Sequence, residues 1–155
     1  MTKSFWTLFI LFILLNFGAL ALGSFFMGEG PISEWYQQLN KAPWTPPGWV
    51  FGVSWFTIMV CLSIALACHF SHKSDKSLII IYGIHLALNI AWNYLFFNQR
   101  WLLFGFMEII LLTGIVFYML VHIGRSNKLN AILLSPYVVW LCIASSLNWY
   151  ALMYN

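Results

Sequence analysis

The chain has 155 residues, of which 62% are hydrophobic and 7% charged, and its net charge is +3 at pH 7. A soluble domain usually carries about a quarter charged residues, so this composition excludes an ordinary soluble protein, which could not hide so much apolar surface from water. The small positive charge does not indicate a nucleic-acid partner, because the few basic residues flank apolar runs and are better explained by membrane topology.

The charged residues leave five long windows that can each cross a bilayer. A transmembrane helix needs about 20 mostly apolar residues. The windows are apolar all round, whereas strands of a membrane barrel alternate apolar and polar residues. We therefore predict an all-α membrane protein, a five-helix bundle forming a single domain over residues 1–155. The predicted spans are about 5–27, 47–70, 78–97, 101–122 and 130–153.

The first window also resembles a signal peptide, since a lysine precedes a hydrophobic run. It is too long for the apolar core of such a peptide and lacks a clear A-x-A cleavage site, so we expect it to be a span. The loops at 69–77, 98–100 and 124–129 are short, so consecutive helices should be antiparallel neighbours.

Lysine and arginine are distributed unevenly between the two ends of this bundle. Two lie in the first and third loops, Lys41 and Arg100, against five at the amino terminus and in the second and fourth loops, namely Lys3, Lys73, Lys76, Arg125 and Lys128. Cytoplasmic loops are enriched in these residues. We therefore expect an integral protein of a bacterial inner membrane, with its amino terminus in the cytoplasm and its first loop outside.

The first loop, residues 28–46, is long enough to cover one end of the bundle. Ser33 and Glu34 provide an N-cap and an acidic first turn, which predicts a short helix with Trp35, Tyr36 and Leu39 on one face. The prolines that follow fix φ and remove amide donors, so the next segment should be stiff and extended. We predict a rigid aromatic lid.

Aromatic and polar side chains recur at helical spacing in three spans. One face of the third span carries His85, Asn89, Trp92, Asn93 and Phe96, and it should point into the bundle because polar groups in lipid are costly. The second span adds Phe51, Trp55 and Met59, and the fifth adds Tyr137, Trp140, Ala144 and Asn148. The polar stripe alone is explained equally well by helix packing, and packing is the better explanation of each aromatic stripe alone. Together they have the usual form of a small-molecule pocket, which would suit a planar aromatic ligand.

Glu108 is the only formal charge inside a predicted span, and an intramembrane acid is a functional hypothesis by default. Because it lies about two turns into its helix, we favour a structural role near the headgroups over proton coupling.

Other residue types give no chemical motif. Cys61, Cys68 and Cys142 form no C-x-x-C pair, no metal site is expected, and His69, His72 and His122 should lie at the membrane interface. Paired carboxylates, a phosphate loop and a serine elbow are all missing from the sequence, so we expect no conventional catalytic dyad or triad.

Three sequence blocks occur in order along most of the chain. They are Trp35-Tyr36-x-x-Leu39-x-Lys41 with Pro43-Trp44-Thr45-Pro46-Pro47-Gly48 and Trp55, then Asn89-x-x-Trp92-Asn93-x-x-Phe96-Phe97, and finally Pro136-Tyr137-x-x-Trp140-x-x-x-Ala144-x-x-Leu147-Asn148. This pattern resembles the TspO family, also known as the translocator protein, tryptophan-rich sensory protein or peripheral-type benzodiazepine receptor family.

The resemblance implies a five-helix bundle, commonly a homodimer, with a cavity under the first loop that binds porphyrins such as protoporphyrin IX and other small hydrophobic ligands. No cofactor is required, and a porphyrin would be ligand or substrate. Ala19 and Gly23 would permit close helix approach, within the bundle or to a second copy. The predicted ligand-binding residues are Trp35, Tyr36, Pro46, Trp55, Met59, Asn89, Trp92, Asn93, Tyr137, Trp140, Ala144 and Asn148.

Some bacterial members degrade protoporphyrin in light, and the resemblance implies that Trp55 and Trp140 would take part. Two other uses stay open, namely transport of tetrapyrroles or lipids and a ligand-regulated stress sensor or scaffold. Mitochondrial members bind cholesterol, but no Lys or Arg follows Tyr137 in this chain, so the weak cholesterol motif is missing and cholesterol is not expected.

Overall fold

The computed structural model describes residues 4–155, so Lys3, which contributes to the topology count, lies outside the described residues. Five helices in it are long and apolar enough to cross a membrane, which confirms the predicted all-α membrane bundle. They are α1 (Phe5–Phe26), α3 (Gly48–His72), α4 (Lys76–Asn93), α5 (Leu102–Gly124) and α6 (Lys128–Tyr154). The remaining elements are the 3-10 turn η1 (Gly30–Ile32), the short helix α2 (Glu34–Gln38) and a π-helix, η2 (Tyr94–Asn98), that continues α4.

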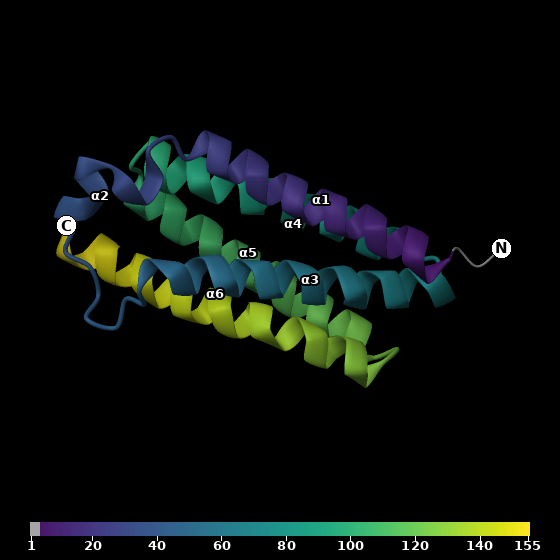
Figure 1. The fold of residues 1–155 in the computed structure, drawn as a ribbon. Helices are drawn as coiled ribbons and strands as arrows, with labels where there is room; N and C mark the ends of the chain where they lie inside the picture. Colours follow the sequence, from purple (N-terminus) through teal and green to yellow (C-terminus); the bar gives the residue numbers. More distant parts are fainter. Residues whose placement is uncertain (1–3) are drawn as a thin grey trace.

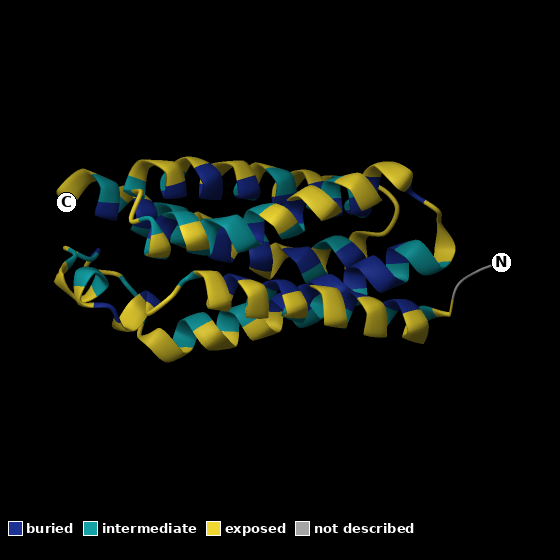
Figure 2. Cartoon of the chain, turned by 90° about the horizontal axis from the view of Figure 1, so that it is seen from above, coloured by how far each residue is buried: buried dark blue, intermediate teal, exposed yellow. Residues whose placement is uncertain are grey.

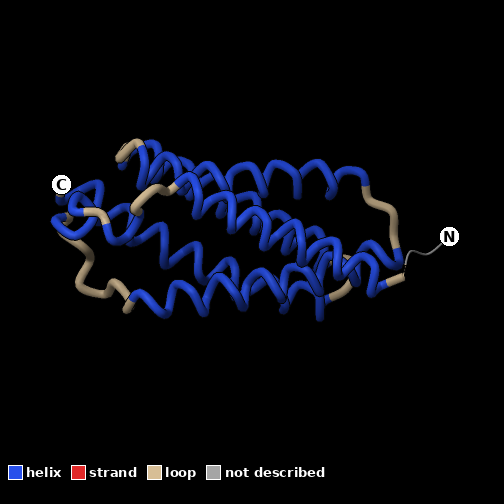
Figure 3. Tube along the Cα trace, turned by 45° about the horizontal axis from the view of Figure 1, so that its top comes forward, coloured by secondary structure: helices blue, strands red, loops and turns tan. Residues whose placement is uncertain are grey.

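The long helices pack as a closed ring in the order α1, α3, α6, α5, α4, and α4 closes it against α1. Figure 1 shows the helices running side by side, with α2 at the end where the carboxyl terminus lies. Figure 3 shows that loops are confined to the two ends of the bundle. We call the end with residues 28–47 the lid end, and the end with residues 73–75 and 125–127 the basic end.

The expectation that all consecutive helices are neighbours is wrong for α3 and α4, which both pack against α1 and have no extensive contact with each other. Lys73 and Asp75 in the connecting segment have extended backbones, with φ of -140° and -138°. An extended chain advances about 3.3 Å or more per residue. This short segment is therefore long enough to pass the end of α1.

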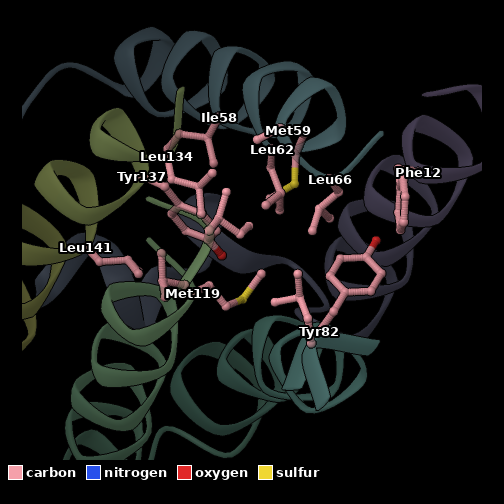
Figure 4. Close-up of a cluster of buried hydrophobic side chains, with 14 of the residues drawn as sticks. Phe12, Ile58, Met59, Leu62, Leu66, Tyr82, Met119, Leu134, Tyr137 and Leu141 are labelled. Carbon is pink, nitrogen blue, oxygen red and sulfur yellow. The ribbon is translucent and has the colours of Figure 1, made fainter. Parts of the chain in front are cut away.

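The hydrophobic core fills the half of the bundle toward the basic end. Met59, Leu62 and Leu66 of α3 meet Met119 of α5 and Leu141 of α6 there, and all five are almost fully buried. Figure 4 shows these side chains converging from different helices, with Tyr82 and Phe12 closing one side. The outward faces of the helices are exposed and apolar, as contact with lipid requires (Figure 2).

Buried polar groups tie the ring together. The Asn16 amide of α1 donates to the Ser63 hydroxyl of α3 at 2.8 Å, and the Tyr82 hydroxyl of α4 donates to the Asn16 carbonyl oxygen at 2.8 Å. On the same side, Gly23 packs against Asn93, where an added Cβ would lie 2.6 Å from the side-chain nitrogen. The close approach predicted at Gly23 is therefore made within the bundle.

Candidate functional site

A cavity of about 730 Å³ occupies the half of the bundle nearest the lid end. Its walls come from α1, α3, α4 and α6, its floor includes Ile109 and Leu112 of α5, and its roof is α2 with the segment that follows it. Small-molecule sites usually measure about 300 to 1,000 Å³ and are mostly apolar with a few polar groups. The cavity has both properties.

The lid begins with the short helix that the sequence predicts. The Ser33 hydroxyl accepts a hydrogen bond from the Tyr36 amide at 3.3 Å, which is the expected N-cap of α2. The Tyr36 ring packs against Phe97 at 5.3 Å between centroids, and Lys41 Nζ lies 4.5 Å from the Tyr36 ring centroid. Burial raises the pKa of the Tyr36 phenol, so this side chain stays a neutral hydrogen-bond donor at physiological pH.

The far side of the lid is fastened to the end of α6. The Asn40 amide nitrogen of the backbone donates to Asn155 Oδ1 at 2.8 Å, and the Asn40 side chain donates to the Tyr154 carbonyl at 2.9 Å. The Trp44 indole donates to the Ser146 hydroxyl at 3.1 Å. The lid is thus held both by aromatic contacts to η2 and by hydrogen bonds to α6.

The wall between α4 and α6 is built on tryptophan and asparagine. Trp92 Nε1 donates to Asn148 Oδ1 at 3.2 Å, and the Asn148 amide donates to the Ala144 carbonyl at 2.9 Å. The Trp92 ring stacks on Phe96 with centroids 5.1 Å apart and planes 14° apart. These contacts fix the orientation of one indole face and one amide at the cavity wall.

The π-helix η2 places the aromatic residues that support the lid. Such single-turn insertions add a residue to the helix and are frequent at functional sites. Phe96 in η2 lies against Gly105 of α5, where an added Cβ would be 3.2 Å from the Phe96 ring. A side chain at position 105 would crowd that ring, so glycine permits the close contact between η2 and α5.

Below the cavity, one hydroxyl serves two polar groups of α4. The Asn89 amide donates to the Tyr137 hydroxyl at 2.9 Å, and the Tyr137 hydroxyl lies 2.8 Å from His85 Nε2. The Tyr137 hydroxyl, with one proton and two lone pairs, thus bridges the Asn89 amide and the His85 ring. The Trp55 ring packs edge-on against Tyr137 with centroids 5.8 Å apart.

Nine of the twelve predicted ligand-binding residues line the cavity, namely Tyr36, Pro46, Trp55, Asn89, Trp92, Asn93, Trp140, Ala144 and Asn148. The other three lie outside its wall. Met59 is 1% exposed and belongs to the core, and Tyr137 is buried behind Asn89 and Trp55. Trp35 packs against Phe96 with ring centroids 5.8 Å apart and against the guanidinium of Arg100, on the lid but outside the cavity.

The sequence did not point to the wall that α1 provides. Phe17, Leu20, Ser24 and Met27 line the cavity, and so do Gln37 and Asn40 of the lid. The α1 residues carry no signal that separates them from a lipid-facing stripe, because their helix is apolar on every side. The lid residues could have been found from their position beside Tyr36 and Lys41.

The sequence did not predict the surroundings of two ionisable residues. Glu108 is only 7% exposed, and neither carboxyl oxygen has a hydrogen-bond partner within residues 4–155. Glu108 does not line the cavity, although the next residue, Ile109, does. His69 is also buried and shares Asp75 with His122.

The cavity offers flat apolar surfaces, five side-chain amides and one cation. Trp55, Trp92 and Trp140 supply the indole faces, and Lys41 is the charged group among the residues that line it. Within the described part of the chain, no group of three His, Cys, Asp or Glu side chains could hold a metal ion. The arrangement suits a large planar molecule that carries anionic or hydrogen-bonding substituents at the lid.

Comparison with known proteins gives one family. The TspO/MBR family model matches residues 9–154. The tryptophan-rich protein TspO of Archaeoglobus fulgidus is 32% identical over 135 residues, which cover 86% of this chain and 87% of that protein. The translocator protein of Homo sapiens is 30% identical over 139 residues, 86% of this chain and 81% of its own. Protein CrtK of Rhodobacter capsulatus is 30% identical over 118 residues, 74% of each chain.

Proposed function

Because the chain belongs to the TspO/MBR family, we propose that it binds porphyrins such as protoporphyrin IX, and related planar hydrophobic ligands, in the cavity beneath the lid. The observation that carries this proposal is the cavity itself, a space of about 730 Å³ bordered by three indoles and five side-chain amides. Aromatic faces favour offset stacking with a flat conjugated ring. The amides provide hydrogen bonds that fix the orientation of the ring.

The position of Lys41 supports one orientation of the ligand. Lys41 lines the cavity at the lid, and its ammonium group is held over the Tyr36 ring and 3.5 Å from Gln37 Oε1. A porphyrin with carboxylate side chains would place them beside this ammonium group and its macrocycle among the indoles. The apolar macrocycle then avoids water, and the carboxylates stay at the polar rim.

Titration of the detergent-purified protein with protoporphyrin IX tests the proposal, with quenching of tryptophan fluorescence as the readout. Ala144→Phe would fill the wall beside Trp140 and should weaken binding at least tenfold. Its neighbour Ile143 faces outward and is 37% exposed, so Ile143→Phe is a control of the same bulk on the same helix. Equal affinity of the two variants would show that porphyrin binds elsewhere on the molecule.

Light-driven degradation of the bound porphyrin is a second candidate function. Trp55 and Trp140 both line the cavity, and Trp140 is held edge-on against Phe51 with centroids 5.2 Å apart. An indole beside a photoexcited porphyrin can donate an electron to it, and dioxygen is the oxidant that such a reaction would consume. This chemistry needs no acid and base pair.

The packing between the cavity and the basic end favours ligand binding over transport. Leu62, Leu66, Met119 and Leu134 fill that half of the bundle and are at most 1% exposed. A transporter would need a second state that opens this packed half. Directional flux of porphyrin in sealed vesicles would support the transporter, and binding without flux would support the receptor or a ligand-regulated sensor.

For the membrane orientation, the proposal rests on the basic residues. Lys73, Lys76, Arg125 and Lys128 all lie at the basic end, and Lys41 and Arg100 lie at the lid end. This bias supports a bacterial inner membrane with the basic end in the cytoplasm. Single cysteines at Ser126 and Gly28, in a background without the three native cysteines, would be labelled from opposite sides of the membrane. A homodimer also belongs to this proposal, and crosslinking in the membrane tests it.

A further inference from the structure

A second hollow lies on the outer surface of the bundle, between α4 and α5. It measures about 430 Å³, and its lining includes Ile81 and Ile84 of α4 and Leu111, Gly114 and Tyr118 of α5. It shares no lining residue with the cavity under the lid. We call it the α4–α5 groove.

The groove exists because the two helices meet above and below it and Gly114 leaves the space between open. Toward the lid end, Phe96 lies against Gly105. At the basic end, Asp75 before α4 accepts a hydrogen bond from His122 of α5 at 2.8 Å. An added Cβ at Gly114 would meet no atom within 4 Å, so nothing in residues 4–155 fills this part of the groove.

The length of the groove along α5 is close to the thickness of one leaflet of a bilayer. At about 1.5 Å per residue, the eight steps from Ile110 to Tyr118 span about 12 Å. The hydrocarbon of a whole bilayer is about 30 Å thick, so this length is close to one leaflet. A helix with its side chains is about 10 Å wide, too wide for so small a hollow, whereas a single acyl chain is slender.

A basic side chain lies in line with the groove. Leu111, Tyr118 and Arg125 are spaced seven residues apart, which places them on one face of α5. Arg125 keeps a helical backbone, with φ of -63° and ψ of -29°, and it is exposed. Its guanidinium therefore belongs to the same stripe as the groove, at the level where a headgroup would lie.

The surrounding charges also favour an anion there. Lys73 and Lys76 are exposed beside the same end of α4. Asp75, the acidic residue of that end, is buried and already accepts hydrogen bonds from His69 at 3.2 Å and His122 at 2.8 Å. Its carboxylate is thus engaged internally, and the accessible charge at the mouth of the groove is positive.

From these features we propose that the α4–α5 groove binds one anionic phospholipid, with an acyl chain along Ile81, Ile84 and Gly114 and the phosphate at Arg125. An acyl chain gains little by moving from bulk lipid to an apolar groove, so shape and charge decide the selectivity. A basic residue near the membrane surface contributes roughly a fivefold preference for anionic lipid.

Native mass spectrometry of the delipidated full chain tests this site, with phosphatidylglycerol and phosphatidylcholine of identical acyl chains as probes. One phosphatidylglycerol should remain bound, with about a fivefold preference over phosphatidylcholine. Gly114→Leu fills the groove and should abolish this binding. Gly83→Leu is the matched control, because position 83 on α4 is exposed, has no atom within 4 Å of an added Cβ, and lies outside the groove.

The charge contact has its own pair of variants. Arg125→Gln should remove the preference for phosphatidylglycerol, and Lys128→Gln at the same end of the bundle should preserve it. Equal effects of the two variants would mean that general surface charge causes the preference for phosphatidylglycerol, which would overturn the site. Unchanged lipid binding in Gly114→Leu would also overturn the site. So would a lipid-free dimer that Gly114→Leu dissociates and Gly83→Leu does not, because the groove would then be an interface between copies.

Discussion

The Nε2 atom of His122, near the end of α5, lies 2.8 Å from the Oδ2 atom of Asp75, which immediately precedes α4. His69 of α3 lies 3.2 Å from the same oxygen, and Asp75 Oδ1 accepts from the Leu78 amide at 3.1 Å. One buried carboxylate therefore joins three helices at the basic end and caps one of them.

This arrangement predicts acid sensitivity of the basic end. The hydrogen bond from His122, with those from Leu78 and His69, lowers the pKa of Asp75 from its ordinary value to about 2. A lowered pKa means that the stabilisation is complete above about pH 4 and is lost as pH falls from there toward 2. The melting temperature of the purified protein should fall over that interval.

Asp75→Asn isolates the charge, because asparagine also caps helices. The variant should melt about 2 to 4 °C lower at pH 7, as expected for a loss of about 1 kcal/mol in a chain of this size. It should also lose part of the acid transition. Glu29→Gln, at an exposed position on the lid side, is the control and should behave like the parent protein. A parental acid profile in Asp75→Asn would rule out this carboxylate as the cause.

Removal of the Tyr137 hydroxyl should destabilise the bundle. Tyr137→Phe leaves the Asn89 amide and His85 Nε2 without the partner that they share at 2.9 and 2.8 Å. A buried polar group without a partner costs about 1 to 3 kcal/mol, so the melting temperature should drop by several degrees. Tyr94→Phe is the control, since Tyr94 is 41% exposed. An equal change in both variants would mean that the shared hydroxyl contributes no stability.

The sequence predicted the five spans because membrane insertion demands long apolar runs, and the charged residues delimit these runs clearly. It predicted contacts between all consecutive helices, and this prediction failed for α3 and α4. The segment of residues 73–75 is short, but extended backbone lets it pass the end of α1, so α3 and α4 lie apart. The length of a loop limits the distance between the two helix ends that it joins, but it does not determine the direction in which the loop leads to the next helix.

Side-chain periodicity predicted which helix faces form the site, but it did not predict how far along each helix the cavity extends. Phe51, Trp55 and Met59 share a face of α3, but Met59 lies about 6 Å farther along the helix than Trp55, where the helices converge on the core. The π-helix η2 was also outside the reach of the sequence, because no proline or glycine marks it. The burial of Met59 and the formation of η2 both depend on how whole helices pack against one another.

The bonds between the lid and α6 should control ligand release. Asn40→Ala removes the hydrogen bond from the Asn40 side chain to the Tyr154 carbonyl. The hydrogen bond that Asn155 donates to the backbone carbonyl of residue 40 is kept. The loss of about 1 kcal/mol from the closed lid should speed porphyrin dissociation about fivefold. Stopped-flow recovery of tryptophan fluorescence measures this rate.

Gln38→Ala is the matched control for the lid, because within residues 4–155 the Gln38 amide bonds only to Glu34 of its own helix, at 3.1 Å. If both variants release porphyrin at the parental rate, the lid is not the barrier to dissociation. If both release it faster, general loosening of α2 is the cause and the bonds to α6 are not.

The two cavity tryptophans allow binding to be separated from photochemistry. Trp55→Phe with Trp140→Phe preserves aromatic surface at both positions, so the affinity for protoporphyrin IX should change less than threefold. Phenylalanine is much harder to oxidise than tryptophan, so loss of porphyrin absorbance under illumination should slow at least tenfold. Trp149→Phe is the control, because that indole is 50% exposed and lies outside the cavity. An unchanged rate in the double variant, with porphyrin still bound, would leave a binding function for the cavity and exclude these two indoles from the photochemistry.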